Sequence, residues 1–188
     1  MIDETTRPAV NEVFNGGFEN TTVAAGSSVF GWQITSIAAA QAAIDSGQSR
    51  SGSRSLRLIL KSTTTLALNT VSQLIVVQPG THYRLQYYAR VDDMRSAGTP
   101  IFEIVDESDN AVLGASAPAP TGTVNWGAFS IDFTTKANTE GIRLRISRAS
   151  CGDDPVCPIF GTVWYDDFNI QLAGRVAGTK PGNDAAAH

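Results

Sequence analysis

The segment Tyr83–Val91, YRLQYYARV, alternates between two sets of side chains with a period of two. One set is Tyr83, Leu85, Tyr87, Ala89 and Val91, and the other is Arg84, Gln86, Tyr88 and Arg90. This period is typical of a β-strand that buries one face and exposes the other. The turn signal Pro79-Gly80 precedes the segment, so we expect a strand that begins at a tight turn.

Further short runs of this kind are bounded by Gly, Pro, Asn, Asp and Ser. They are Ser55–Lys61, Thr64–Val77, Ile101–Glu107, Asn125–Phe133, Gly141–Ser147 and Thr162–Leu172. In the last run we expect one parity to face inward, namely Trp164, Asp166, Phe168, Ile170 and Leu172. The Ala-rich segment Ser36–Ile44 suits either two helical turns or a strand. Roughly eight or nine strands without alternating helices predict an all-β fold, an antiparallel two-sheet β-sandwich.

The 188 residues allow one domain with a substantial core. The net charge of −4 argues against a nucleic-acid partner, which favours a basic surface. No run approaches the ~20 apolar residues of a membrane span. We expect a lead-in at residues 1–10, the sandwich at 11–172, and a flexible tail or linker at 173–188, where apolar periodicity is lost.

Cys151 and Cys157 are the only cysteines and flank a turn rich in Asp, Gly and Pro. They suit a disulfide or two free thiols, whereas a zinc site would need about four ligands and finds only His82 and His188 to complete it. We favour a disulfide, which indicates an oxidising compartment. The N-terminus MIDE lacks signal-peptide features. We therefore expect any export signal to be missing from this sequence, and the protein to be secreted, extracellular or periplasmic.

Catalytic patterns are weak. A glycosidase needs two carboxylates across a cleft, but acids such as Asp92, Asp93 and Asp109 fall in predicted turns and loops. A Ser-His-Asp triad would depend on His82, and no Gly-x-Ser-x-Gly elbow is present. The sequence predicts a protein that is not an enzyme.

Several short elements occur in a characteristic order. They are Asn15-Gly16-Gly17-Phe18-Glu19, Gly31-Trp32, Ser51–Leu56, Val77–Leu85, Tyr88–Arg90, Trp126, Phe133-Thr134 and Val163–Phe168. With this order and spacing the chain resembles the CBM4/9/22-like carbohydrate-binding superfamily over almost all of residues 13–172. The resemblance implies a galactose-binding-domain-like jelly roll, a fold that serves many functions.

The resemblance also implies a structural calcium ion. By motif position its ligands are Glu19, Asp166 or Asp167, and carbonyls of the loop 45–53. Two adjacent carboxylates are costly unless a cation or donors neutralise them, and Ca²⁺ accepts six to eight oxygen ligands. In the other interpretation Glu19 caps a turn and both aspartates are solvated.

In the superfamily, sugars bind through aromatic and polar side chains on the concave sheet or at loop tips. The candidate ligand-binding residues are Gln33, Gln86, Tyr88, Arg90, Arg143, Arg145 and Tyr165, and we expect them to share a face. Trp32 and Trp126 match core positions, and Trp164 has inward parity. The arginines form either a solvated face that prevents edge pairing or partners for an acidic, uronic ligand.

We therefore expect a non-catalytic accessory domain of an exported protein that binds a polysaccharide or oligosaccharide on its concave face and carries Ca²⁺. The alternative is a structural or protein-interaction sandwich that has lost sugar binding.

Overall fold

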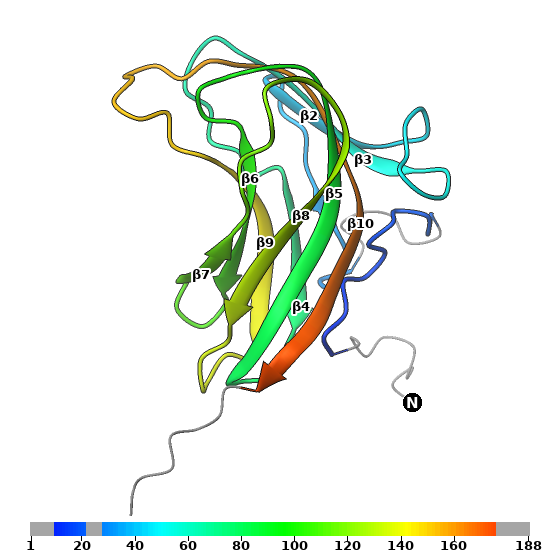
Figure 1. The fold of residues 1–188 in the computed structure, drawn as a ribbon, viewed down its shortest axis with the longest axis vertical. Coiled ribbons are helices and arrows are strands. Elements are labelled where there is room, and N and C mark those ends of the chain that lie inside the picture. The colour runs from blue at the N-terminus through cyan, green and yellow to red at the C-terminus, as the bar shows by residue number, and fades with distance from the viewer. Residues whose placement is uncertain (1–9, 22–27, 176–188) are drawn as a thin grey trace, which may run out of the picture.

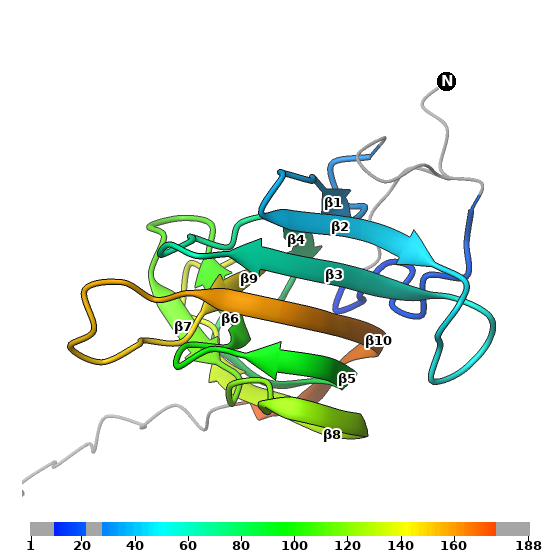
Figure 2. The same cartoon turned by 90° about the horizontal axis from the view of Figure 1, so that it is seen from above.

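The computed structural model describes residues 10–21 and 28–175, which contain ten strands and no helix. The strands are β1 (Gln33–Ile34), β2 (Ala40–Asp45), β3 (Ser55–Ser62), β4 (Val71–Val76), β5 (Thr81–Arg95), β6 (Pro100–Asp106), β7 (Val112–Ala115), β8 (Gly122–Thr134), β9 (Gly141–Arg148) and β10 (Ile159–Arg175). They form two antiparallel sheets, sheet A with the order β1-β4-β9-β6-β7 and sheet B with the order β2-β3-β10-β5-β8. Figures 1 and 2 show the sheets as two packed layers. The predicted β-sandwich is confirmed.

The strand interpretation is correct for the Ala-rich segment, because β2 occupies most of it and pairs with β3. The predicted boundary at Leu172 is too early, since β10 continues to Arg175. The expected lead-in and tail fall mostly on residues outside the described part of the chain. None of the described segments forms a helix able to span a membrane.

The core lies between the sheets and is rich in aromatic rings. Every apolar position predicted in Tyr83–Val91 is at most 4% exposed. Tyr87 of sheet B packs against Phe102 of sheet A with ring centroids 5.2 Å apart, and Tyr165 lies 5.0 Å from Phe102. Because each such ring contributes roughly 1.5–3 kcal/mol on burial, this cluster is a main source of the attraction between the sheets.

A β-bulge interrupts β10 within the closing motif. Asp166 pairs with Tyr88 and Asn169 pairs with Gln86, so β10 carries one residue more than β5 between these pairs. Asp167 takes up the extra residue with a φ of 54°, a left-handed conformation that Asp tolerates better than most residues. The inward parity therefore changes across the bulge, from Val163 and Tyr165 before it to Phe168 and Ile170 after it.

The N-terminal NGGFE element packs against this bulge. Phe168 N donates a 3.0 Å hydrogen bond to the Gly16 carbonyl, and a Cβ on Gly16 would lie 2.0 Å from the Phe168 carbonyl oxygen. The Trp32 ring packs 5.2 Å from Phe18 and 5.0 Å from Phe168, and its Nε1 donates to the Asn15 carbonyl at 3.1 Å. Motifs from three parts of the chain thus share one cluster, and only glycine fits at position 16.

Both ends of the described chain lie near the β4–β5 turn. Val10 forms a parallel bridge with Val76 at the end of β4. Arg175 pairs with Thr81 at the start of β5. The loop 149–158 lies at the other end of the sandwich, because it follows the end of β9 that pairs with Pro100 (Figure 1).

Candidate functional site

The outer face of sheet B brings together three of the predicted ligand-binding residues. Gln86, Tyr88 and Arg90 alternate with buried residues on β5, and Trp164 of β10 is the registered partner of Arg90. In Figure 1 the long strands β5 and β10 bend toward sheet A. This face is therefore the convex side of sheet B, and the expected concave placement of these residues is wrong.

Trp164 lies across the sheet rather than in the core. Its Nε1 donates a 2.8 Å hydrogen bond to Oδ2 of Asp45 on β2, although β3 separates β2 from β10. Two strand spacings amount to about 10 Å, so the indole must extend along the sheet surface to reach Asp45. Arg57 of β3 pairs with the same carboxylate at 3.2 Å. The half-buried indole thus presents a fixed, flat surface.

The core assignment is confirmed for Trp32, which is 3% exposed. It is wrong for Trp164 and Trp126, which are half-buried and lie outside the core cluster. For Trp164 the reason is the bulge. The extra residue at Asp167 shifts the alternation by one position, so Phe168 points into the core whereas Trp164 points to the outer face of sheet B.

Arg90 lies beside the indole. Its Cζ is 5.9 Å from the Trp164 ring centroid, and its Nη1 donates to Oδ1 of Asn125 on β8 at 3.2 Å. Its Nε is buried and has no hydrogen-bond partner among the described residues. Gln86 is exposed on the same strand. The face therefore combines an aromatic surface with polar groups that hold unused donors.

Tyr88 is less accessible to a ligand than its position on this face predicts. The Arg50 guanidinium carbon lies 3.5 Å from the Tyr88 ring centroid. The same guanidinium pairs with Asp167 through a 2.6 Å contact. One face of the Tyr88 ring is thus already covered.

Arg143 and Arg145 lie on β9 of sheet A, on the opposite outer face of the sandwich. The expectation that they share a face with the β5 residues is wrong, because sheet membership depends on strand order and not on parity. Arg143 pairs with Glu107 at 2.6 Å, and Arg145 pairs with Glu103 at 2.8 Å. Each guanidinium already has a carboxylate partner.

Gln33 of β1 is also part of sheet A, in register with Ser72, which in turn pairs with Arg145. Its side-chain amide donates to the carbonyls of Ser28 and Gly31 at 2.8 and 3.3 Å. Gln33 therefore belongs to a polar row across sheet A and not to the face that carries Trp164.

Tyr165 points into the core. Its side chain is 1% exposed, burial raises the pKa of its hydroxyl well above the usual value, and the hydroxyl has no hydrogen-bond partner among the described residues. The expected outward orientation is wrong, and such a ring does not reach a ligand on the surface.

Glu19 is held by the turn that follows β2. The backbone N–H groups of Ser53 and Arg54 both donate to its Oε1 at 2.8 Å, and the Ser53 hydroxyl donates to Oε2 at 2.9 Å. The hydrogen bond from the Ser53 backbone is the main reason that the pKa of Glu19 is lowered. Gly52, with a φ of 59°, leaves the room that the carboxylate occupies.

Asp166 and Asp167 contact the same turn at the preceding residues, Arg50 and Ser51. Asp166 is fully buried, and its Oδ2 accepts hydrogen bonds from the backbone N–H groups of Arg50 and Ser51 at 2.8 and 3.2 Å. Its Oδ1 accepts the Asp167 N–H at 2.8 Å. Burial is the main cause that raises the pKa of Asp166, and the neighbouring Asp167 charge adds to it. The Ser51 hydroxyl donates to Asp167.

Glu19 and Asp166 could supply only a few of the six to eight oxygen ligands of a calcium ion. A carboxylate has about four lone-pair positions, and the hydrogen bonds to Glu19 and to Asp166 use three on each. The described residues hold no group of three or more Asp, Glu, His or Cys side chains placed for a metal ion. A calcium ion would therefore be held by one oxygen each of Glu19 and Asp166, with backbone carbonyls supplying the rest. A cation would also suit the site electrostatically. Burial disfavours the ionised form of Asp166, and a nearby positive charge would offset that cost.

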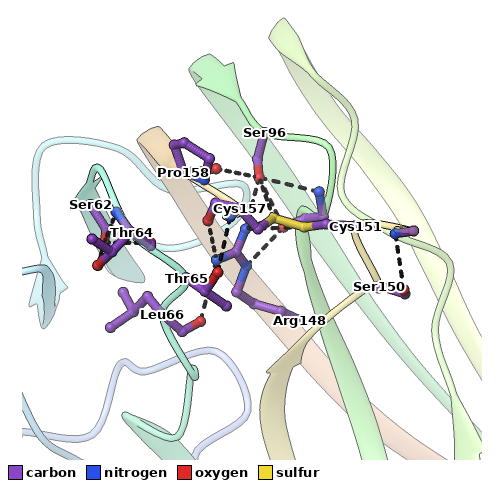
Figure 3. The surroundings of a disulfide bond; sticks show 12 residues. Ser62, Thr64, Thr65, Leu66, Ser96, Arg148, Ser150, Cys151, Cys157 and Pro158 are labelled. Carbon is purple, nitrogen blue, oxygen red and sulfur yellow. Dashed lines mark hydrogen bonds between the residues drawn. A yellow bond between two sulfur atoms is a disulfide. The ribbon is translucent and has the colours of Figure 1, made fainter. Parts of the chain in front are cut away.

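The predicted disulfide is present between Cys151 and Cys157. Figure 3 shows the guanidinium of Arg148 beside it. Arg148 donates to the carbonyls of Gly98 and Cys157 at 2.9 and 3.0 Å, to Ser96 Oγ at 2.8 Å, and to Cys157 Sγ at 2.8 Å. Burial lowers the pKa of Arg148. These contacts fix the loop 149–158 against neighbouring strands, which is a structural role.

A small cavity that sequence reasoning missed lies beside the NGGFE element. It has a volume of about 190 Å³, and its lining includes Phe14, Trp32, Ile34, Ile44 and Arg54. Its residues come from four separate parts of the chain, so no local sequence pattern marks it.

A comparison with curated proteins found no match. Among solved structures, the xylan-binding CBM22-1 domain of Paenibacillus barcinonensis Xyn10C is 12% identical, with a TM-score of 0.54 over 91% of this chain and 99% of that one. TmCBM61 in complex with β-1,4-galactotriose is 17% identical, with a TM-score of 0.54 over 87% and 99%. A cyclase from Fischerella sp. TAU is 11% identical, with a TM-score of 0.58 over 90% and 98%. At these identities the likeness concerns the fold alone.

The chain spans 29% of a larger neighbour, the CBM22-1–GH10 modules of Clostridium thermocellum xylanase 10B, at 14% identity and a TM-score of 0.53. The family model described as "Carbohydrate binding domain" matches residues 10–151, well over half of the chain. Together with the observed sandwich of two five-stranded sheets, this match shows that the chain belongs to the CBM4/9 carbohydrate-binding domain family.

Proposed function

We propose that this domain binds a glycan on the outer face of sheet B, with the Trp164 indole as the surface on which a sugar ring stacks. The observation that carries the proposal is the hydrogen bond from Trp164 to Asp45, which holds the indole along the sheet. A pyranose ring has an apolar C–H face that packs on an aromatic plane, and an indole held in place loses little conformational entropy on binding. Gln86 and Arg90 supply donors for hydroxyl groups.

The other outer face lacks such a surface. The five strands of sheet A contain a single aromatic residue, Phe102, and its side chain is fully buried. The guanidinium groups of Arg143 and Arg145 are paired with glutamates. Sheet B is therefore the better candidate, and its half-buried Trp164 and Trp126 argue against a sandwich that has lost sugar binding.

We further propose a non-catalytic, accessory role in an exported protein. The disulfide between Cys151 and Cys157 suits an oxidising compartment. Carbohydrate-binding families commonly act as attachment modules, and the match of this chain to a part of a larger xylanase structure agrees with such an arrangement. The fold does not set the role by itself, because a cyclase shares it.

A structural calcium ion held by Glu19 and Asp166 is also part of the proposal. The support is the buried position of Asp166, whose pKa is raised by burial, next to the second carboxylate of Asp167. The ion would favour the ionised form of Asp166 and join the NGGFE element, the turn 46–54 and the bulge of β10.

Affinity gel electrophoresis against a panel of neutral and acidic polysaccharides tests the glycan site. We expect retention of the wild type and loss of at least about tenfold in affinity in Trp164→Ala, since a central aromatic contact commonly contributes more than ~1.4 kcal/mol. Arg145→Ala on sheet A is the matched control and is expected to bind normally. Loss in Arg145→Ala with normal binding in Trp164→Ala would place the site on sheet A, and no retention on any polysaccharide would exclude glycan binding.

A further inference from the structure

We propose that the outer face of sheet B selects a sugar that carries a carboxylate, such as a uronic acid, and that Arg90 binds this carboxylate. This inference rests on the proposed glycan site and names its ligand class.

Among the four arginines of β3 and β5, strands that the structure describes in full, Arg90 alone has no carboxylate partner among the described residues. Arg54 and Arg148 also lack an ion pair within the described part of the chain, but they lie outside these two strands. Six others each pair with a carboxylate, namely Arg50, Arg57, Arg84, Arg95, Arg143 and Arg145. Within the described residues the side chain of Arg90 makes one hydrogen bond, to the neutral amide of Asn125. A guanidinium has five N–H groups, so most of its donor capacity is unused.

The surroundings of Arg90 do not supply a carboxylate. Asp45 faces the far side of the indole and is engaged by Arg57 and by Trp164. Asp92, two residues further on β5, accepts the Thr123 hydroxyl at 3.0 Å. Asp167 is paired with Arg50. The positive charge of Arg90 is therefore the one that remains without an ion-pair partner on this part of the face.

The Nε of Arg90 is buried. It has no hydrogen-bond partner among the described residues, and an unsatisfied buried donor costs roughly 1–3 kcal/mol. Such a group needs an explanation in a folded protein, but the buried Nε is itself out of reach of a ligand, so a carboxylate would engage the Nη groups of Arg90. A carboxylate accepts two parallel, charge-assisted hydrogen bonds from a planar guanidinium, and these are stronger than hydrogen bonds between neutral groups.

The position of Arg90 also suits a substituent on a stacked ring. Its Cζ lies 5.9 Å from the Trp164 ring centroid, so the guanidinium is adjacent to the surface on which a sugar ring would stack. The carboxylate at C5 of a uronic acid is such a group. A neutral hexose places a hydroxymethyl there, which forms a weaker hydrogen bond with a guanidinium.

Isothermal titration calorimetry with two matched ligand pairs tests this inference. The first pair is oligogalacturonate and its methyl ester, and the second is xylan oligosaccharides with and without glucuronate substituents. We expect the acidic member of at least one pair to bind at least about tenfold tighter, which corresponds to ~1.4 kcal/mol, with the difference shrinking at high salt. Arg90→Gln should remove the preference, because the acidic member should lose at least about tenfold in affinity whereas the neutral member, which loses only a hydroxyl contact, should lose much less.

Arg84→Gln is the control, because Arg84 lies on the same strand but is paired with Asp132; it should keep the preference. Equal binding of acidic and neutral members in both pairs, or a preference that survives Arg90→Gln, would overturn the inference. Neutral binding that depends on Trp164 would then leave the glycan site itself intact. Failure of every ligand, together with no retention on any polysaccharide, would remove both proposals.

Discussion

The guanidinium carbon of Arg50 lies 3.5 Å from the ring centroid of Tyr88, and its Nη1 donates to Asp167. One side chain from the turn after β2 thus joins β5 to the bulge of β10. The contact stabilises both strands by a cation–π interaction and an ion pair, and it occupies a ring that the sequence presents as a binding surface.

This contact leads to a prediction about the relative importance of two aromatic residues. Tyr88→Ala is expected to reduce glycan affinity less than Trp164→Ala, because Arg50 already covers one face of the Tyr88 ring. Calorimetry on both variants, after circular dichroism has established that they fold, provides the comparison. An equal or larger loss in Tyr88→Ala would mean that the ligand displaces Arg50.

Calcium is expected to raise the melting temperature, and a chelator to lower it, because the ion would stabilise the buried charge of Asp166. The response should disappear in Glu19→Gln. Asp132→Asn, which changes an exposed acid paired with Arg84, should keep it. A wild type with the same melting temperature in calcium and in chelator would show that the N–H groups of the turn neutralise these carboxylates without a cation.

Asp106 is expected to control part of the acid sensitivity of the fold. Burial alone would raise its pKa, but hydrogen bonds from Thr139 and Ser108 and the charge of Lys136 outweigh burial, and the pKa falls from 3.8 to about 2. The stabilisation from this group is therefore complete above its unfolded-state pKa and is lost as the pH falls toward 2.

Asp106→Asn should accordingly melt at a lower temperature at neutral pH and lose less stability between pH 4 and pH 2 than the wild type. Thermal melts followed by circular dichroism across this range measure both effects. The same acid sensitivity in wild type and variant would assign it to other carboxylates.

Gly16→Ala is expected to destabilise the protein by at least about 2 kcal/mol, because the new methyl group would overlap the Phe168 carbonyl, which cannot move without disrupting the bulge. Gly127→Ala on β8 is the matched control, since a Cβ there meets no atom within 4 Å. Chemical denaturation of both variants gives the two free energies of unfolding. Similar values would mean that the NGGFE segment can shift away from β10.

Reduction of the disulfide is expected to cost about 2 kcal/mol, as the chain-entropy model gives for a loop this short. A lower melting temperature in reductant would show the effect, and Cys151→Ser/Cys157→Ser should match the reduced protein and ignore reductant. If reductant leaves the wild-type melt unchanged although thiol titration shows full reduction, the contacts of Arg148 are sufficient to hold the loop.

The sequence was most informative where one strand follows one period. In Tyr83–Val91 the alternation predicts every buried and outward position correctly, because β5 stays regular through this stretch. The motif order identifies the family, and the spacing of Cys151 and Cys157 favours the disulfide that is present.

Two kinds of wrong prediction, in side-chain orientation and in sheet membership, have causes that the pattern of residues along one strand does not show. The bulge at Asp167 inserts a residue, so Trp164 and Tyr165 have the orientations opposite to those that an unbroken alternation with Phe168 predicts. Arg143 and Arg90 share a periodicity but lie in different sheets, because strand order is a long-range property. The sequence therefore predicted correctly that Gln86, Tyr88 and Arg90 share a face, but it did not predict which other residues lie on that face.

The bridge of Val10 with Val76 and the pairing of Arg175 with Thr81 have a practical consequence. The two ends of the described chain, Val10 and Arg175, therefore leave the sandwich at the same end, away from the middle of both sheet faces. On a biosensor chip, N-terminal and C-terminal immobilisation should therefore leave the indole of Trp164 equally accessible to long polymers.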